Sequence, residues 1–147
     1  MIFIDTDVFV IDLRYHRDPK YPENSRFLQV IAENAKATTS CYNVLETCGI
    51  LAFNLNRKQL YELYHYMPRK YNLHKVAPLK SGEKLPSLRI SALMDVIAEK
   101  TSFGDAQVIC AALDMIDELT CFVSWQADHF RGKLPLDILT PSDYLAR

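Results

Sequence analysis

Short runs of β-branched and aromatic residues alternate along this chain with longer segments in which apolar residues recur every three or four positions. The short runs predict strands, and the first of them, residues 2–5, indicates a buried strand that leads into an acidic turn. Residues 8–11 have a similar β-prone composition. The other predicted strands are 37–40, 72–78, 120–125 and 137–141.

Helical spacing of apolar residues follows most of these strands. The predicted helices are 25–36, about 43–52, 57–70 with an end at Met67-Pro68, 88–99 and 102–119. Loops are expected at 17–25, which contains two prolines, and at 80–87. Because strands alternate with helices, we expect an α/β fold with a mainly parallel sheet of four to five strands, covered on both faces.

Composition and charge are those of an ordinary globular protein. The 147 residues predict a single domain spanning 1–147, with 49% hydrophobic and 24% charged residues and a formal net charge of −1. This balance argues against a uniformly basic protein that coats long nucleic acids. No apolar run reaches the roughly 18–20 residues that a membrane helix needs, and the N-terminus lacks the basic region of a signal peptide. The four cysteines show no CxxC pair, so we expect a cytoplasmic protein without disulfides.

Three acidic residues lie at predicted strand-to-helix junctions. Asp5 follows the first strand, Glu46 comes three residues after Asn43, and Asp105 comes three residues after Ser102. Each has a structural alternative: Asp5 could cap a helix, and the other two have the spacing of a capping box. A parallel sheet, however, gathers such junctions along one edge, where ligands bind.

Carboxylates gathered at one edge would repel one another and raise their pKa values unless a cation neutralised them. An oxygen-only ligand set favours Mg²⁺ or Mn²⁺ over zinc. Such ions support phosphoryl chemistry, because they bind a phosphate and activate a water. The acids therefore predict a magnesium or manganese site made by Asp5, Glu46 and Asp105.

Five sequence blocks occur in an order that resembles the motif blocks of PIN domains. They are FIDTDVFVIDL, TTSCYNVLE, SFGDAQVICAA, VSWQADHF and ILTPSDYL, and together they extend from residue 2 to about 145. The resemblance implies a three-layer α/β/α sandwich and Mg²⁺- or Mn²⁺-dependent endoribonuclease activity. Many members of that family are VapC-like toxins, which a cognate antitoxin inhibits and which are commonly dimeric. The resemblance thus implies an RNA substrate, an antitoxin partner and a homodimer.

Carried over by position, Asp5, Glu46 and Asp105 resemble the three principal acids of the family. The fourth position, often Asp or Asn in PIN domains, falls here on Gln126, two residues after Ser124. Gln126 is therefore expected to contribute a neutral oxygen, and Gln126 or Ser124 to position a water or the phosphate. Asp128 could compensate for the missing charge, although it is better explained as a solvated loop acid. Asp7 is expected to add charge behind the ligands or to cap a helix.

Two other functions stay open on the sequence alone. A neutral Gln126 is compatible with a PIN-like module that binds RNA or protein with weak or absent activity. The DTD sequence after the first strand also resembles haloacid-dehalogenase-like phosphatases, although their usual Gly-Thr is missing and the chain is short for that fold. Surplus aromatics such as Tyr61 and Tyr64 are candidates for a dimer contact, unless both prove fully buried within one protomer.

Overall fold

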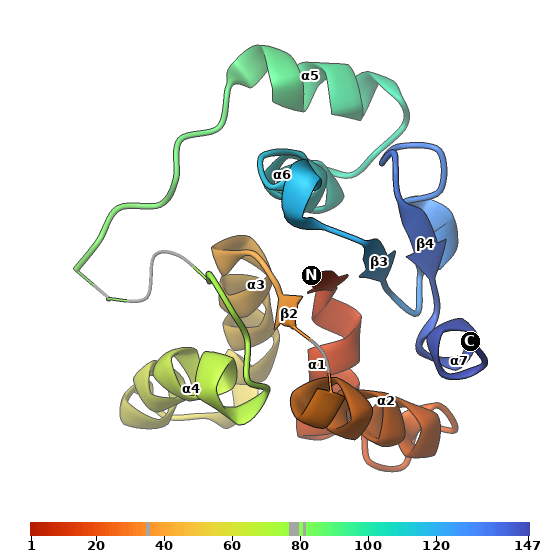
Figure 1. Cartoon of the computed structure of the whole chain (residues 1–147). Helices are drawn as coiled ribbons and strands as arrows, with labels where there is room; N and C mark the ends of the chain where they lie inside the picture. Colours follow the sequence, from red (N-terminus) through yellow and green to blue (C-terminus); the bar gives the residue numbers. More distant parts are fainter. Residues whose placement is uncertain (35, 77–79, 81) are drawn as a thin grey trace.

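The fold is built around a parallel sheet of four short strands (Figure 1). A computed structural model describes residues 1–34, 36–76, 80 and 82–147. Within them the strands are β1 (Ile2–Ile4), β2 (Ala37–Thr38), β3 (Cys121–Val123) and β4 (Asp137–Leu139). Their order is β2-β1-β3-β4, and every neighbouring pair is parallel. The carboxyl ends of β1 and β3, the two central strands, therefore meet at one edge.

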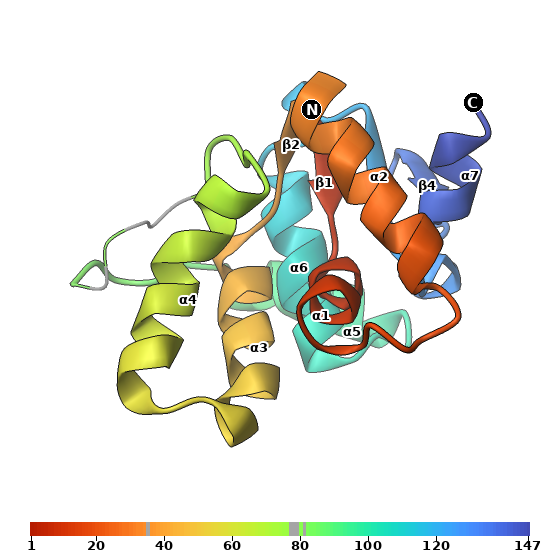
Figure 2. The same ribbon diagram turned by 90° about the horizontal axis from the view of Figure 1, so that it is seen from below.

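Helices cover both faces of this sheet, with α6 on one side and α1 and α2 on the other (Figures 1 and 2). The helices on the first side are α5 (Ile90–Ala98) and α6 (Phe103–Leu113). The remaining helices of the fold are α1 (Thr6–Arg14), α2 (Tyr21–Asn34), α3 (Cys41–Leu51), α4 (Arg57–Lys70) and α7 (Pro141–Leu145). Short 3₁₀ turns occur at Ala52–Asn54, Ile116–Glu118 and Ala127–His129. In Figure 2, α4 lies alongside α3.

Two apolar cores, one on each face, hold the layers together. Alternate residues of β1 point to opposite faces, so Ile2 and Ile4 pack with α1 and α2 while Phe3 packs with α6. The Phe3 ring stacks on Phe122 of β3, with ring centroids 5.1 Å apart. Since both faces are buried, the predicted α/β/α sandwich with a parallel sheet is confirmed.

The predicted strand at 72–78 is not a strand over the part that the structure describes. Residues 77 and 78 lie outside the described residues, and in 72–76 only a single parallel bridge joins Leu73 to Ala37. The backbone takes positive φ values at Asn72 (50°) and Lys75 (54°), which interrupt an extended run. The described sheet therefore has four strands.

Several helix boundaries differ from the prediction. The second helix begins at Tyr21 because Pro22 fits its first turn, where a missing N–H costs nothing. Pro68 lies inside α4, which continues to Lys70. The helix predicted to reach 119 ends at Leu113, before a separate 3₁₀ turn. The β-prone residues 8–11 are helical because Asp5 caps the start of α1 directly after β1.

None of the helices in the described part of the chain is long and apolar enough to cross a membrane.

Removing the central aromatic stack should destabilise the whole fold. Phe122 is fully buried and also contacts the ring of Phe130. We expect Phe122→Ala to lower the free energy of unfolding by about 3–5 kcal/mol, measured by urea denaturation. Phe53→Ala is the matched control, because Phe53 is 90% exposed and its loss should change stability by less than about 0.5 kcal/mol. Equal effects of the two variants would contradict this description of the core.

Candidate functional site

Asp5 lies where β1 passes directly into α1. Its backbone N–H donates to the Val123 carbonyl at 3.0 Å, which continues the sheet, while its side chain accepts from the Thr6 N–H at 2.8 Å and caps α1. The carboxylate also accepts from Asn43 Nδ2 at 3.1 Å and from Ser124 Oγ at 2.8 Å. Asp5 is only 8% exposed. The side chain thus caps the helix and also occupies the edge where the strands end.

Ser124, directly after β3, joins Asp5 to a second carboxylate. Its hydroxyl lies 2.8 Å from Asp5 Oδ2 and 3.1 Å from Asp7 Oδ2. A hydroxyl has one hydrogen to donate, so it satisfies one of these oxygens at a time. The backbone N–H of Gln126 donates to Asp7 Oδ2 at 3.0 Å and to Ser124 Oγ at 2.9 Å. Asp5, Asp7 and Ser124 therefore form one closely coupled group.

Glu46 has no part in capping α3. Ser40 is the N-cap, and Asn43 completes the capping box with it, so the capping explanation for Glu46 is wrong. The Glu46 carboxylate accepts instead from Thr6 Oγ1 at 2.5 Å. The buried Asn43 amide donates to both Asp5 Oδ1 and Thr6 Oγ1, at 3.1 and 3.0 Å. This chain of hydrogen bonds links Glu46 to Asp5.

Asp105 lies in the first turn of α6, beside this network. Ser102 caps the helix by accepting from the Asp105 N–H at 3.1 Å, and the Asp105 carboxylate lies 3.8 Å from His129 Nδ1. A Cβ added to the neighbouring Gly104 would lie 3.8 Å from Glu46 Oε1, so the start of α6 adjoins Glu46. The three predicted acids thus lie at the same edge of the sheet.

Burial disfavours the charged forms of Asp5 and Asp7 at this edge. Burial, together with the nearby charge of Asp7 and, less strongly, that of Glu46, raises the pKa of Asp5 to about 8. Burial likewise raises the pKa of Asp7. Within the described part of the chain, neither these residues nor Glu46 forms an ion pair. A bound cation would supply the missing positive charge, and carboxylate oxygens are the donors that Mg²⁺ and Mn²⁺ prefer.

The side chains are not pre-arranged as a closed metal cage. Among the described residues, no three His, Cys, Asp or Glu side chains are grouped closely enough to hold a metal ion as they stand. The donor chemistry fits a divalent cation, and so does the absence of an ion pair to Asp5, Asp7 or Glu46 among the described residues, where only the more distant charge of Lys20 lowers the pKa of Asp7. The ligand set Asp5, Glu46 and Asp105 stays a prediction.

The remaining predicted site residues lie around this network of acids. The Gln126 side chain is exposed, and its hydrogen bonds to Asp7 and Ser124 use the backbone N–H. Asp128 is also exposed and pairs with Arg131, which agrees with its interpretation as a solvated loop acid. Sequence reasoning missed Thr6 and His129. Thr6 and Glu46 are 40 positions apart, and no spacing pattern in the sequence predicts their contact.

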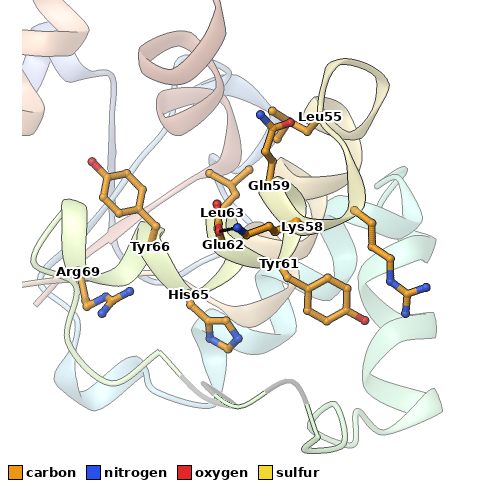
Figure 3. Close-up of a pocket in the computed structure, with 10 residues that line it drawn as sticks. Leu55, Lys58, Gln59, Tyr61, Glu62, Leu63, His65, Tyr66 and Arg69 are labelled. Carbon is orange, nitrogen blue, oxygen red and sulfur yellow. Dashed lines mark ion pairs between the residues drawn. The ribbon is translucent and has the colours of Figure 1, made fainter.

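A separate groove lies on the outer side of α4 (Figure 3). Its lining includes Arg57, Tyr61, His65, Tyr66 and Arg69, and none of the predicted acids. Tyr61 is 50% exposed and not fully buried, so it stays a candidate for the predicted dimer contact. The groove is therefore distinct from the acidic edge of the sheet.

Comparison with known proteins supports the fold. No family model and no curated protein matches the sequence. The chain is similar in structure to FitAcB from Neisseria gonorrhoeae, with a TM-score of 0.59 and 18% identity over 97% of this chain and 99% of that one. It is also similar to a structure of FitAB bound to an IR36 DNA fragment, with a TM-score of 0.57 and 20% identity over 96% and 95% of the two chains. The predicted PIN-like fold is thereby confirmed.

The raised pKa of Asp5 makes a prediction about stability and pH. Between about pH 4 and pH 8 the folded state holds a proton on Asp5 that the unfolded state releases, so the free energy of unfolding should fall as pH rises. Asp5→Asn should flatten this slope, because its amide is neutral at every pH. Urea denaturation in EDTA at pH 5, 6, 7 and 8 measures both slopes. Identical slopes would show that Asp5 is ionised throughout in the folded protein.

Proposed function

We propose that this protein is a Mg²⁺- or Mn²⁺-dependent endoribonuclease that hydrolyses RNA phosphodiester bonds. The observation that carries the proposal is the network at the carboxyl ends of the strands, in which the carboxylates of Asp5 and Asp7 share the Ser124 hydroxyl without an ion-pairing partner among the described residues, and hydrogen bonds through Asn43 and Thr6 connect them to the exposed Glu46. A purely structural network would not need two adjoining acids whose burial disfavours their charge. The PIN-like fold supports a nuclease over the phosphatase alternative.

In this proposal Asp5, Glu46 and Asp105 hold the metal. A bound Mg²⁺ or Mn²⁺ would activate a water and stabilise the charge that develops on the phosphate. The other residues of the network hold the ligands in place: Asn43 and Ser124 fix the two oxygens of Asp5, and Thr6 fixes one oxygen of Glu46. Such outer partners restrict rotation of the carboxylates and favour one arrangement of the ligands.

The finer proposal concerns partners. Because its motif blocks resemble those of VapC-like toxins, we propose that the protein is the toxin of a VapBC-type pair and that an antitoxin inhibits it. We also propose a homodimer, in which the exposed aromatics of α4, such as Tyr61 and Tyr66, face the second protomer.

A second candidate is a PIN-like module that binds RNA or protein without cutting it. The exposed and neutral side chain of Gln126 favours this candidate, because the site then lacks a charged residue at the fourth position. Tight Mn²⁺ binding that Asp5→Asn abolishes, together with no cleavage of any RNA pool, would indicate this function instead.

Substituting the predicted ligands should abolish cleavage. Loss of even an outer partner of a metal typically costs 10–100-fold, so we expect Asp5→Asn and Asp105→Asn to reduce the rate by at least about 100-fold. The measurement is Mn²⁺-dependent cleavage of a fluorescent RNA pool by the purified full-length chain. Asp95→Asn is the control, since Asp95 is an exposed acid of α5.

Unfolding in urea should show that the two inactive variants remain folded, because an amide preserves the shape of the carboxylate. Cleavage that persists in either variant would show that the ligand assignment is wrong.

A further inference from the structure

The two carboxylate oxygens of Asp7 differ in their hydrogen bonds to the described residues. Its Oδ2 accepts from Ser124 Oγ at 3.1 Å and from the Gln126 N–H at 3.0 Å. Its Oδ1 is buried and makes no hydrogen bond in the described part of the chain, although the Trp125 backbone N–H lies near enough to this carboxylate to lower its pKa. A buried polar atom without a partner is costly, and native proteins rarely keep one without a reason.

The position of Asp7 suggests what this oxygen is for. Ser124 Oγ lies within hydrogen-bond distance of both Asp5 Oδ2 and Asp7 Oδ2, so the two carboxylates are held on either side of one hydroxyl. Asp5 is the central predicted ligand. A group held so close to it, with a buried oxygen left over, is placed to complete the coordination of the same ion.

Position 126 enters the site in a different way. The Gln126 side chain is exposed, whereas its backbone N–H donates to Asp7 Oδ2. The turn after β3 therefore anchors the Asp7 carboxylate and does not itself bring a carboxylate into the site. If Asp7 only anchored this turn, the hydrogen bonds of its Oδ2 would be explained, but the burial of its Oδ1 would not.

We propose that Asp7, and not Gln126, supplies the fourth metal-facing oxygen of this site through its Oδ1, with Gln126 acting through its backbone to hold Asp7 in place. The proposal rests on the proposed function, because it assumes that Asp5, Glu46 and Asp105 bind a divalent ion. It restores the fourth negative charge that the sequence lacks at position 126. The site would then contain four carboxylates, of which two come from the segment 5–7.

Titration of the full-length chain with Mn²⁺ alone, followed by calorimetry, tests this proposal. We expect Asp7→Asn to weaken Mn²⁺ binding at least about tenfold, because affinity for such ions depends on the number of charged ligands. Gln126→Ala should weaken it far less, since its backbone N–H is retained. Asp95→Asn, an exposed acid on α5, should bind as the wild type does.

The free energy of unfolding by urea in EDTA shows whether Asp7 has only a structural role. The metal-free stability of Asp7→Asn should equal or exceed that of the wild type, because the amide oxygen can still accept from Gln126 while a buried charge is removed. Asp7→Ser serves as the second variant if Asp7→Asn does not fold, and the same loss of affinity is expected.

The outcomes separate this inference from the function on which it rests. Wild-type affinity in Asp7→Asn, or a loss in Gln126→Ala as large as that in Asp7→Asn, would overturn the role of Asp7 and leave the metal site standing. A loss of affinity in Asp7→Asn that came with an equal loss of metal-free stability would identify a structural anchor and also overturn it. A wild-type chain that binds no Mn²⁺ would overturn the proposed function itself.

Discussion

The burial of the Asp5 carboxylate at the junction of β1 and α1 is the constraint on which the site depends. This one side chain caps a helix, receives the Asn43 amide from α3 and receives the Ser124 hydroxyl from the end of β3. It therefore connects three elements that are far apart in the sequence. The same burial disfavours its charge, so the arrangement that orders the edge of the sheet also leaves it in need of a cation.

The sheet explains why these residues meet. The strand order places β1 and β3 side by side, and their carboxyl ends deliver Asp5 and Ser124 to the same point. Phe3 and Phe122, two residue pairs before Asp5 and Ser124, stack on each other and fix the register of the two strands. Packing in the core thus sets the distance between the polar groups at the edge. A change in the packing of either strand would therefore move the polar groups of the site.

Much of this arrangement could be predicted from the sequence, because strand-to-helix junctions in a parallel sheet converge. The α/β class, the order of the elements and the position of Asp5 all follow from local patterns. The strand predicted at 72–78 is absent from its described part, because Asn72 and Lys75 take positive φ values that the tertiary path of the chain sets. The capping role predicted for Glu46 is wrong for a local reason: Ser40, three residues before Asn43, caps the helix instead.

The partners of the acids could not be predicted at all. Thr6 reaches Glu46, and His129 approaches Asp105, through contacts that only the folded chain creates. The orientation of position 126 likewise depends on the turn after β3, where the backbone rather than the side chain meets Asp7. Residue type at a family position is a weak guide when the turn itself supplies the contact.

Binding of a divalent ion by the carboxylates at this edge can be tested in a crystal structure of the protein grown with Mn²⁺. We expect an anomalous density peak among Asp5, Glu46 and Asp105, within coordination distance of their carboxylate oxygens. A well-ordered edge without such a peak at saturating Mn²⁺, or a peak bound only elsewhere on the molecule, would contradict it.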